Sequence, residues 1–153
     1  MRFAICDDER MHINELESYF AQKEELQIES EPFESGEALL DAYKQGQQSF
    51  DALFIDLEMG GMNGIETANA IRAIDERVII VFVTSHEGYA IDCFQCSPLR
   101  FLKKPLQPEK MDEALWAIEQ HLSKIRRIVH FTFDKAQYRL YEDGIIYLES
   151  CDH

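Results

Sequence analysis

Charged and hydroxyl side chains directly follow four short apolar runs of this 153-residue chain. Asp7 and Asp8 follow the first run, and Asp56, Thr84 and Lys104 follow later ones. If these runs are parallel strands of one open sheet, the side chains meet in the crevice outside the carboxyl ends of the strands. Neighbouring carboxylates repel and raise each other's pKa unless a cation offsets them. Three carboxylates in one crevice therefore predict a bound Mg²⁺, which prefers oxygen ligands and often also takes a phosphate oxygen.

Asp56 has the most specific role in this chemistry. An aspartate carboxylate can attack phosphorus to form an acyl phosphate, provided that the incoming negative charge is neutralised. The metal would bridge a carboxylate and one phosphoryl oxygen, Lys104 would contact a second, and Thr84 would donate a hydrogen bond to a third. Taken singly, Asp8 and Thr84 can instead be helix caps, and Lys104 a solvated strand end. Their joint placement favours the phosphoryl site.

The spacing of apolar residues predicts the elements that hold this site. Short apolar runs alternate with stretches of helical period, which is typical of an α/β protein with helices on both faces of a doubly wound parallel sheet. We expect strands at residues 2–6, 27–33, 51–55, 78–83 and 99–102. A glycine-rich loop at residues 59–64 should join the third strand to the third helix. We expect helices at residues 9–26, from an N-cap at Ser35 to Gly46, and at residues 86–94. A further helix carries the apolar stripe Ile65, Ala68, Ile71 and Ile74. The last helix begins near Pro108 and carries the apolar stripe Met111, Leu115, Ile118, Leu122 and Ile125.

Beyond Arg127 the sequence changes to a strand-like period. Residues 129–133, 138–141 and 145–148 read as strands, and Asp143-Gly144 is a strong hairpin signal. Three short strands bury too little to form a core alone. We therefore predict a first domain at residues 1–126 and a β-rich tail at 127–153, which is truncated, docked on the first domain or paired with another chain.

Composition limits the possible functions. A net charge of −14 should repel nucleic acid and anionic lipid, so these residues are not expected to bind either. No apolar run approaches the roughly 20 residues that span a bilayer, and the start does not resemble a signal peptide, which predicts a cytoplasmic location and no membrane partner. Cysteine spacing does not indicate a disulfide framework. Cys93 and Cys96 form a lone CxxC, which we interpret as packing residues rather than half a zinc or redox site.

The order of the site residues along the chain carries a family resemblance. The residues are Asp7-Asp8, Asp56 within the segment 55–59, Gly64, Thr84, Phe101 and Lys104-Pro105. Over about residues 1–126 this set resembles the receiver domain of two-component response regulators. The resemblance implies a flavodoxin-like, five-stranded parallel sheet in the order 2-1-3-4-5. It also implies that Asp56 accepts a phosphoryl group from the phosphohistidine of a sensor histidine kinase.

The same resemblance implies a metal shell. Asp8 and Asp56 would bind Mg²⁺ by their side chains, Glu58 by its backbone carbonyl, and Asp7 mainly through water. Many receivers have proline where this chain has Gly60, and glycine admits more backbone conformations. The loop that carries Glu58 is therefore expected to be looser here, with a modest cost in metal affinity.

The resemblance further implies a switch. Lys104 would contact the phosphoryl group, the Thr84 hydroxyl would shift toward it, and Phe101 would turn inward, altering the surface of the fourth helix, fifth strand and fifth helix. For Phe101 the alternative is core packing in both states. The apolar stripe on the last helix supports a secondary hypothesis of a homodimer.

Residues 145–150 resemble the early strands of the LytTR type of DNA-binding domain, which follows receivers in transcription regulators. Only its first part would be present, so DNA binding would need segments absent here. The alternative is an unrelated strand extension.

Two other functions use similar residues. A Mg²⁺-dependent phosphohydrolase of the haloacid dehalogenase type would also form an aspartyl phosphate, but it places a DxD pair after the nucleophile strand, whereas Asp56 is followed by Glu58. A degenerate receiver that only binds partners is disfavoured by the complete acid, hydroxyl and lysine set. We expect no enzyme activity beyond self-catalysed phosphorylation and dephosphorylation.

Overall fold

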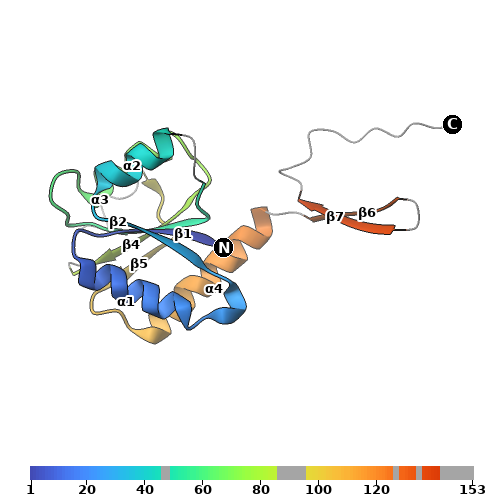
Figure 1. Ribbon diagram of the computed structural model, residues 1–153, viewed down its shortest axis with the longest axis horizontal. Helices are drawn as coiled ribbons and strands as arrows, with labels where there is room; N and C mark the ends of the chain where they lie inside the picture. Colours follow the sequence, from blue (N-terminus) through green and yellow to red (C-terminus); the bar gives the residue numbers. More distant parts are fainter. Residues whose placement is uncertain (46–48, 86–95, 126–127, 134–135, 142–153) are drawn as a thin grey trace. The chain divides into compact units, whose positions relative to one another are not determined.

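The computed structural model describes residues 1–45, 49–85, 96–125, 128–133 and 136–141, with side chains up to residue 124 (Figure 1). The chain divides into two compact units, Met1–Leu115 and Trp116–His153. The first unit carries every predicted site residue.

The first unit is built on a five-stranded parallel sheet in the order β2-β1-β3-β4-β5. This order confirms the predicted α/β fold. Each strand begins within two residues of its predicted start, because apolar runs between polar residues determine which segments are buried. The strands are β1 (Arg2–Cys6), β2 (Glu29–Phe33), β3 (Ala52–Asp56), β4 (Ile79–Thr84) and β5 (Arg100–Lys103).

The helices differ more from expectation at their ends. They are α1 (Arg10–Ala21), the 3₁₀ turn η1 (Glu24–Leu26), α2 (Gly36–Lys44), α3 (Gly64–Arg72) and α4 (Pro108–Ile125). The predicted cap is confirmed, since the Ala38 N–H donates to Ser35 Oγ at 3.2 Å. The first helix was predicted too long, because it ends at Ala21 and Gln27 takes a left-handed φ of 47° before β2. Ile74 lies beyond the end of α3 and is half exposed. The predicted helix at 86–94 and the stop at Gly46 lie outside the described residues.

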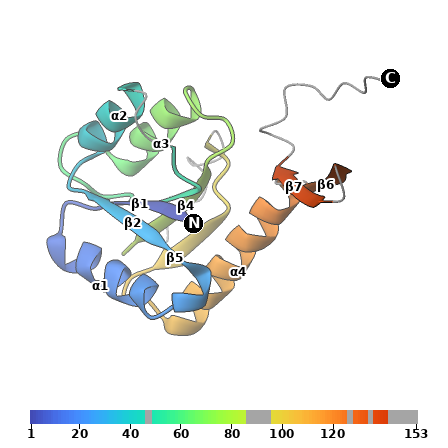
Figure 2. The same cartoon turned by 45° about the vertical axis from the view of Figure 1, so that its right-hand side comes forward.

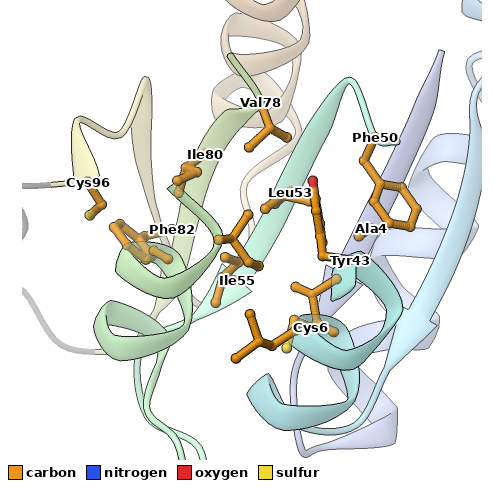
Figure 3. Packing of buried hydrophobic residues seen from close by; sticks show 14 of the residues in the cluster. Ala4, Cys6, Tyr43, Phe50, Leu53, Ile55, Val78, Ile80, Phe82 and Cys96 are labelled. Carbon is orange, nitrogen blue, oxygen red and sulfur yellow. The ribbon is translucent and has the colours of Figure 1, made fainter. Parts of the chain in front are cut away.

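Helices cover both faces of the sheet. Figures 1 and 2 show α2 and α3 together on one face and α1 on the other. Alternate residues of β3 therefore pack in opposite directions: Leu53 and Ile55 join the cluster under α2 and α3 (Figure 3), while Phe54 lies 5.0 Å from the ring of Phe20 in α1. Every residue of β3 and β4 is buried, as expected for central strands of a parallel sheet.

The second unit contains an antiparallel hairpin of β6 (Ile128–Phe133) and β7 (Ala136–Tyr141). These strands correspond to the first two predicted for the tail. The third predicted strand and the Asp143-Gly144 turn lie outside the described residues.

Candidate functional site

The five side chains that were predicted to meet stand at one edge of the sheet. Asp7 and Asp8 follow β1, Asp56 and Thr84 end β3 and β4, and Lys104 follows β5. The strands are parallel and in register, with Asp56 opposite Val83 and Thr84 opposite Lys103, so their carboxyl ends coincide. Asp7, Asp56 and Thr84 are each at most 5% exposed.

The ammonium group of Lys104 joins two of the acids. Its Nζ donates to Asp7 Oδ2 at 2.7 Å and to Asp56 Oδ2 at 2.8 Å, and its side chain is only 7% exposed. The backbone N–H of Lys104 donates to the Thr84 carbonyl at 2.8 Å, which ties the lysine to the end of β4. A single buried cation therefore offsets two buried carboxylates.

Burial and charge alter the protonation of this pair. Burial raises the pKa of the Asp56 carboxyl above its ordinary value, and this effect exceeds the lowering by the Lys104 ammonium. Burial on its own would lower the pKa of Lys104, but the hydrogen bonds to Asp56 and Asp7 outweigh it, so that pKa is raised. The lysine thus stays charged at neutral pH.

The loop between β3 and α3 is fixed around the acids by backbone donors. The Glu58 N–H donates to Asp56 Oδ1 at 3.3 Å, and the Gly60 N–H donates to Asp8 Oδ2 at 2.9 Å. A proline at position 60 has no N–H to donate, so this bond requires a residue other than proline there. The Met62 N–H donates to the carboxylate of Glu37 in α2 at 2.9 Å. The looser loop expected from Gly60 stays a prediction; the Gly60 N–H bonds the loop to Asp8.

Gly64 brings α3 close to the acceptor strand. A Cβ at this position would lie 2.1 Å from the backbone oxygen of Asp56 and 2.9 Å from Leu57 Cα. The Gly64 N–H donates to the Leu57 carbonyl at 3.1 Å. The glycine is therefore required by close approach of two backbone segments.

The acids fit a magnesium ion in type and spacing. One carboxylate oxygen from each of Asp7, Asp8 and Asp56 lies within 4.8 Å of the others. Opposite ligands of an octahedral Mg²⁺ are about 4.2 Å apart, so a small closure of this cluster would suffice. Asp7 and Asp56 each accept hydrogen bonds on both oxygens: Asp7 from the Glu9 N–H and Lys104, and Asp56 from the Glu58 N–H and Lys104.

Phe101, the predicted switch aromatic, lies on β5 with 43% of its surface exposed. Its ring is 5.5 Å from that of Phe82. It is therefore neither a core residue nor fully solvated in this structure.

Two residues of the site were missed by the sequence reasoning. Glu37 holds the loop through Met62, and His12 in α1 contacts both Asp7 and Lys104. His12 stands five residues after Asp7, and nothing in that spacing distinguishes it from a surface residue of an amphipathic helix. His12 reaches Lys104 only because α1 runs over this edge of the sheet.

This fold and this set of residues define a class of protein, and comparison with known families gives the same class. The chain belongs to the response regulator receiver domain family, whose sequence pattern matches residues 3–116. In sequence it is similar to the sensory transduction protein LytT of Oceanobacillus iheyensis, with 35% identity over 127 residues, 80% of this chain and 50% of that protein. It is also similar to LytR of Streptococcus mutans, with 30% identity over 131 residues, 82% of this chain and 52% of that protein. The chain thus spans about half the length of these relatives.

Solved structures show the same fold. The response regulator protein TrrA from Thermotoga maritima, in complex with Mg²⁺ and BeF, is 25% identical, with a TM-score of 0.64 over 76% of this chain and 97% of that one. The N-terminal domain of a response regulator protein from Carboxydothermus hydrogenoformans is 21% identical, with a TM-score of 0.71 over 82% and 99%. Within the described part of the chain, no helix has the length and apolar character to cross a membrane.

Proposed function

We propose that this chain is a phosphorylation switch that accepts a phosphoryl group on Asp56 from the phosphohistidine of a sensor histidine kinase. The observation that supports it best is the buried Lys104 ammonium, which lies 2.8 Å from Asp56 and 2.7 Å from Asp7 at the mouth of the sheet. It is a fixed positive charge beside the carboxylate that must receive a dianionic group.

In the proposed step a carboxylate oxygen of Asp56 forms a bond to phosphorus while the bond from phosphorus to the donor imidazole nitrogen breaks. The electron pair of that bond remains on the nitrogen. Asp56 reacts as the ionised carboxylate, so no proton leaves it. Lys104 moves one donor to a phosphoryl oxygen, and Thr84, 5% exposed at the end of β4, donates to another.

Mg²⁺ is part of the proposal. As the receiver resemblance implies, Asp8 and Asp56 would hold it by their side chains, Glu58 by its carbonyl and Asp7 mainly through water. When bound, the ion neutralises negative charge that gathers on the phosphoryl oxygens. The TrrA structure contains Mg²⁺ with a fluoride of beryllium, which supports this assignment by similarity.

The output of the switch is proposed from the relatives. LytT and LytR are named sensory transduction proteins, and the part of each that this chain matches is about half of its length. We place the receiver at residues 1–126 and the start of a LytTR-type DNA-binding domain at 127–153, so that the whole regulator would control transcription in the cytoplasm. Phosphorylation would act on Thr84 and Phe101 and favour a homodimer. Light scattering that gives a monomer for both the phosphorylated and the unmodified chain would contradict the dimer.

Asp56→Asn tests the acceptor directly. Acetyl phosphate with Mg²⁺ should add one acid-labile phosphoryl group to the parent chain, as acetate leaves with the electron pair of the broken P–O bond. Intact-protein mass spectrometry should show this adduct on the parent and on Asp41→Asn, whose carboxylate is exposed on α2, and none on Asp56→Asn. A parent chain without an adduct would remove the basis of the proposal.

The phosphohydrolase alternative makes the opposite prediction. It requires rapid multiple turnover of small phosphate esters, with the same dependence on Asp56. The receiver family match gives this alternative no support. Release of many equivalents of phosphate per chain within minutes would revive it.

A further inference from the structure

His12 lies in the first turns of α1 and faces the phosphoryl crevice. Its side chain is 16% exposed, and its Nδ1 lies 2.9 Å from Lys104 Nζ and 3.3 Å from Asp7 Oδ1. These residues are separated by 92 positions in sequence for the lysine and five for the aspartate. Within the part of the chain that the structure describes, His12 is the one residue of α1 within hydrogen-bond distance of the Lys104 ammonium.

Hydrogen-bond capacity decides what this contact is. A lysine ammonium has three donors and no acceptor. Lys104 has three neighbours to receive them, Asp7 Oδ2 at 2.7 Å, Asp56 Oδ2 at 2.8 Å and His12 Nδ1 at 2.9 Å. Since the ammonium cannot accept, Nδ1 must accept, and the imidazole then carries its proton on Nε2. The longer contact to Asp7 Oδ1, which already receives the Glu9 N–H, is then a close approach and not a hydrogen bond.

We propose that His12 is a positioning residue that holds the Lys104 ammonium during phosphoryl transfer. This role rests on the proposed function. The Asp56 carboxylate loses its charge when it becomes an acyl phosphate. The N–H of Lys104 that donated to Asp56 is then free to donate to a phosphoryl oxygen. Asp7 and His12 keep the other two donors and fix the nitrogen in place. An uncharged imidazole does this without adding a further negative charge opposite the incoming phosphoryl group, which a third carboxylate would do.

Three substitutions of His12 test whether its role depends on the hydrogen-bond acceptor at Nδ1 or only on the shape of the side chain. In His12→Asn the side-chain amide occupies roughly the place of Nδ1, in His12→Gln it reaches roughly the place of Nε2, and in His12→Leu no acceptor remains. With acetyl phosphate and Mg²⁺, His12→Leu and His12→Gln should form the adduct roughly tenfold more slowly than the parent, because a charged hydrogen bond is lost. His12→Asn should stay within about threefold of the parent. The slower adduct formation should persist at saturating acetyl phosphate, because His12 acts on the transfer step and not on the binding of acetyl phosphate.

A second readout needs no phosphorylation. Lys104 should react slowly with an acetylating N-hydroxysuccinimide ester in the parent, because its ammonium is buried and bonded. In His12→Leu and His12→Gln its labelling, measured by peptide mass spectrometry, should rise roughly fivefold, and in His12→Asn it should not. Lys110, exposed on α4, is the internal control and should be labelled equally in all chains.

The outcomes are distinguishable. Equal rates and equal labelling in all variants overturn the role of His12 while leaving the phosphoacceptor function intact. Equal losses in His12→Asn and His12→Leu overturn it as well, since shape would then matter and not the acceptor. No adduct on the parent overturns the proposed function and with it this role, even when the labelling order holds. If His12→Leu does not fold by circular dichroism, the comparison of Asn with Gln decides alone.

Discussion

At the scale of single residues, the Lys104 ammonium offsets the repulsion between carboxylates that the sequence predicted at the sheet edge. Three acids in one crevice predicted a divalent cation, and the structure places the Lys104 ammonium there, bonded to Asp7 and Asp56. Removing one partner of such a buried pair leaves an uncompensated charge, which typically costs several kcal/mol. The lysine therefore maintains the crevice as well as serving the proposed transfer step.

Gly64 gives the sharpest residue-scale prediction for stability. Gly64→Ala should lower the free energy of unfolding by about 3 kcal/mol, because its Cβ would meet three backbone atoms of the Asp56–Leu57 segment that cannot rotate away. Urea unfolding at pH 7 measures the change. Gly60→Ala is the matched control, since its Cβ would lie 3.8 Å from Asp8 Oδ2, and it should change the value by less than about 0.5 kcal/mol. Equal effects of the two substitutions would contradict the close approach.

At the scale of elements, Tyr19 attaches α1 to the first turn of α4. Its hydroxyl donates to Asp112 Oδ1 at 2.6 Å and lies 3.0 Å from the Pro108 carbonyl, and Lys23 pairs with the same carboxylate. The contact joins residues 89 positions or more apart, so it stabilises the tertiary arrangement of the two helices and not either helix alone.

Tyr19→Phe should lower the free energy of unfolding by about 1 kcal/mol at pH 8. Burial and then the Asp112 hydrogen bond raise the pKa of Tyr19 from 10.0 to about 12. The folded state thus retains the phenol proton more tightly than the unfolded chain. The contribution is present in full below pH 10 and is lost as the pH rises toward 12, so the difference between parent and variant should shrink over that window. Urea unfolding at pH 8 and at pH 11 checks this.

Tyr43→Phe provides the control for that prediction. The Tyr43 hydroxyl is buried and has no hydrogen-bond partner in the described part of the protein. Its removal should leave stability unchanged or raise it by about 1 kcal/mol. A similar loss in both variants at pH 8 would show that the Tyr19 hydrogen bonds contribute nothing specific.

For the whole molecule, charge is the dominant property. The chain carries a net charge of −14, and three of its 29 acidic residues lie together at the proposed metal site. Any cation relieves general repulsion by screening, whereas only a bound ion stabilises through mass action. The two effects can be separated by experiment.

Mg²⁺ at ten times its dissociation constant should raise the free energy of unfolding by about 1.4 kcal/mol beyond NaCl of equal ionic strength. Chelation should reverse the gain. Asp8→Asn should lose the specific part and keep the part due to screening. Thermal unfolding measures both, and equal stabilisation by the two salts would contradict a metal site at the sheet edge.

The sequence by itself determined the fold class, the strand positions and the gathering of Asp7, Asp8, Asp56, Thr84 and Lys104. It could do so because apolar periodicity reports local burial, and parallel strands joined by helices bring their carboxyl ends to one edge. The end of α1 was predicted less well: the helix ends at Ala21, and the 3₁₀ turn Glu24–Leu26 and a left-handed Gln27, which the helical pattern does not indicate, separate it from β2.

Tertiary structure alone decided the contacts within that edge. It brought His12 to Lys104, attached the Gly60 loop to Asp8, and placed Glu37 against Met62. Such contacts depend on the direction of a helix over the sheet and on side-chain rotamers, and neither leaves a period in the sequence. The sequence therefore predicted which residue types lie at the site. Which atom accepts each hydrogen bond could be determined only from the folded structure.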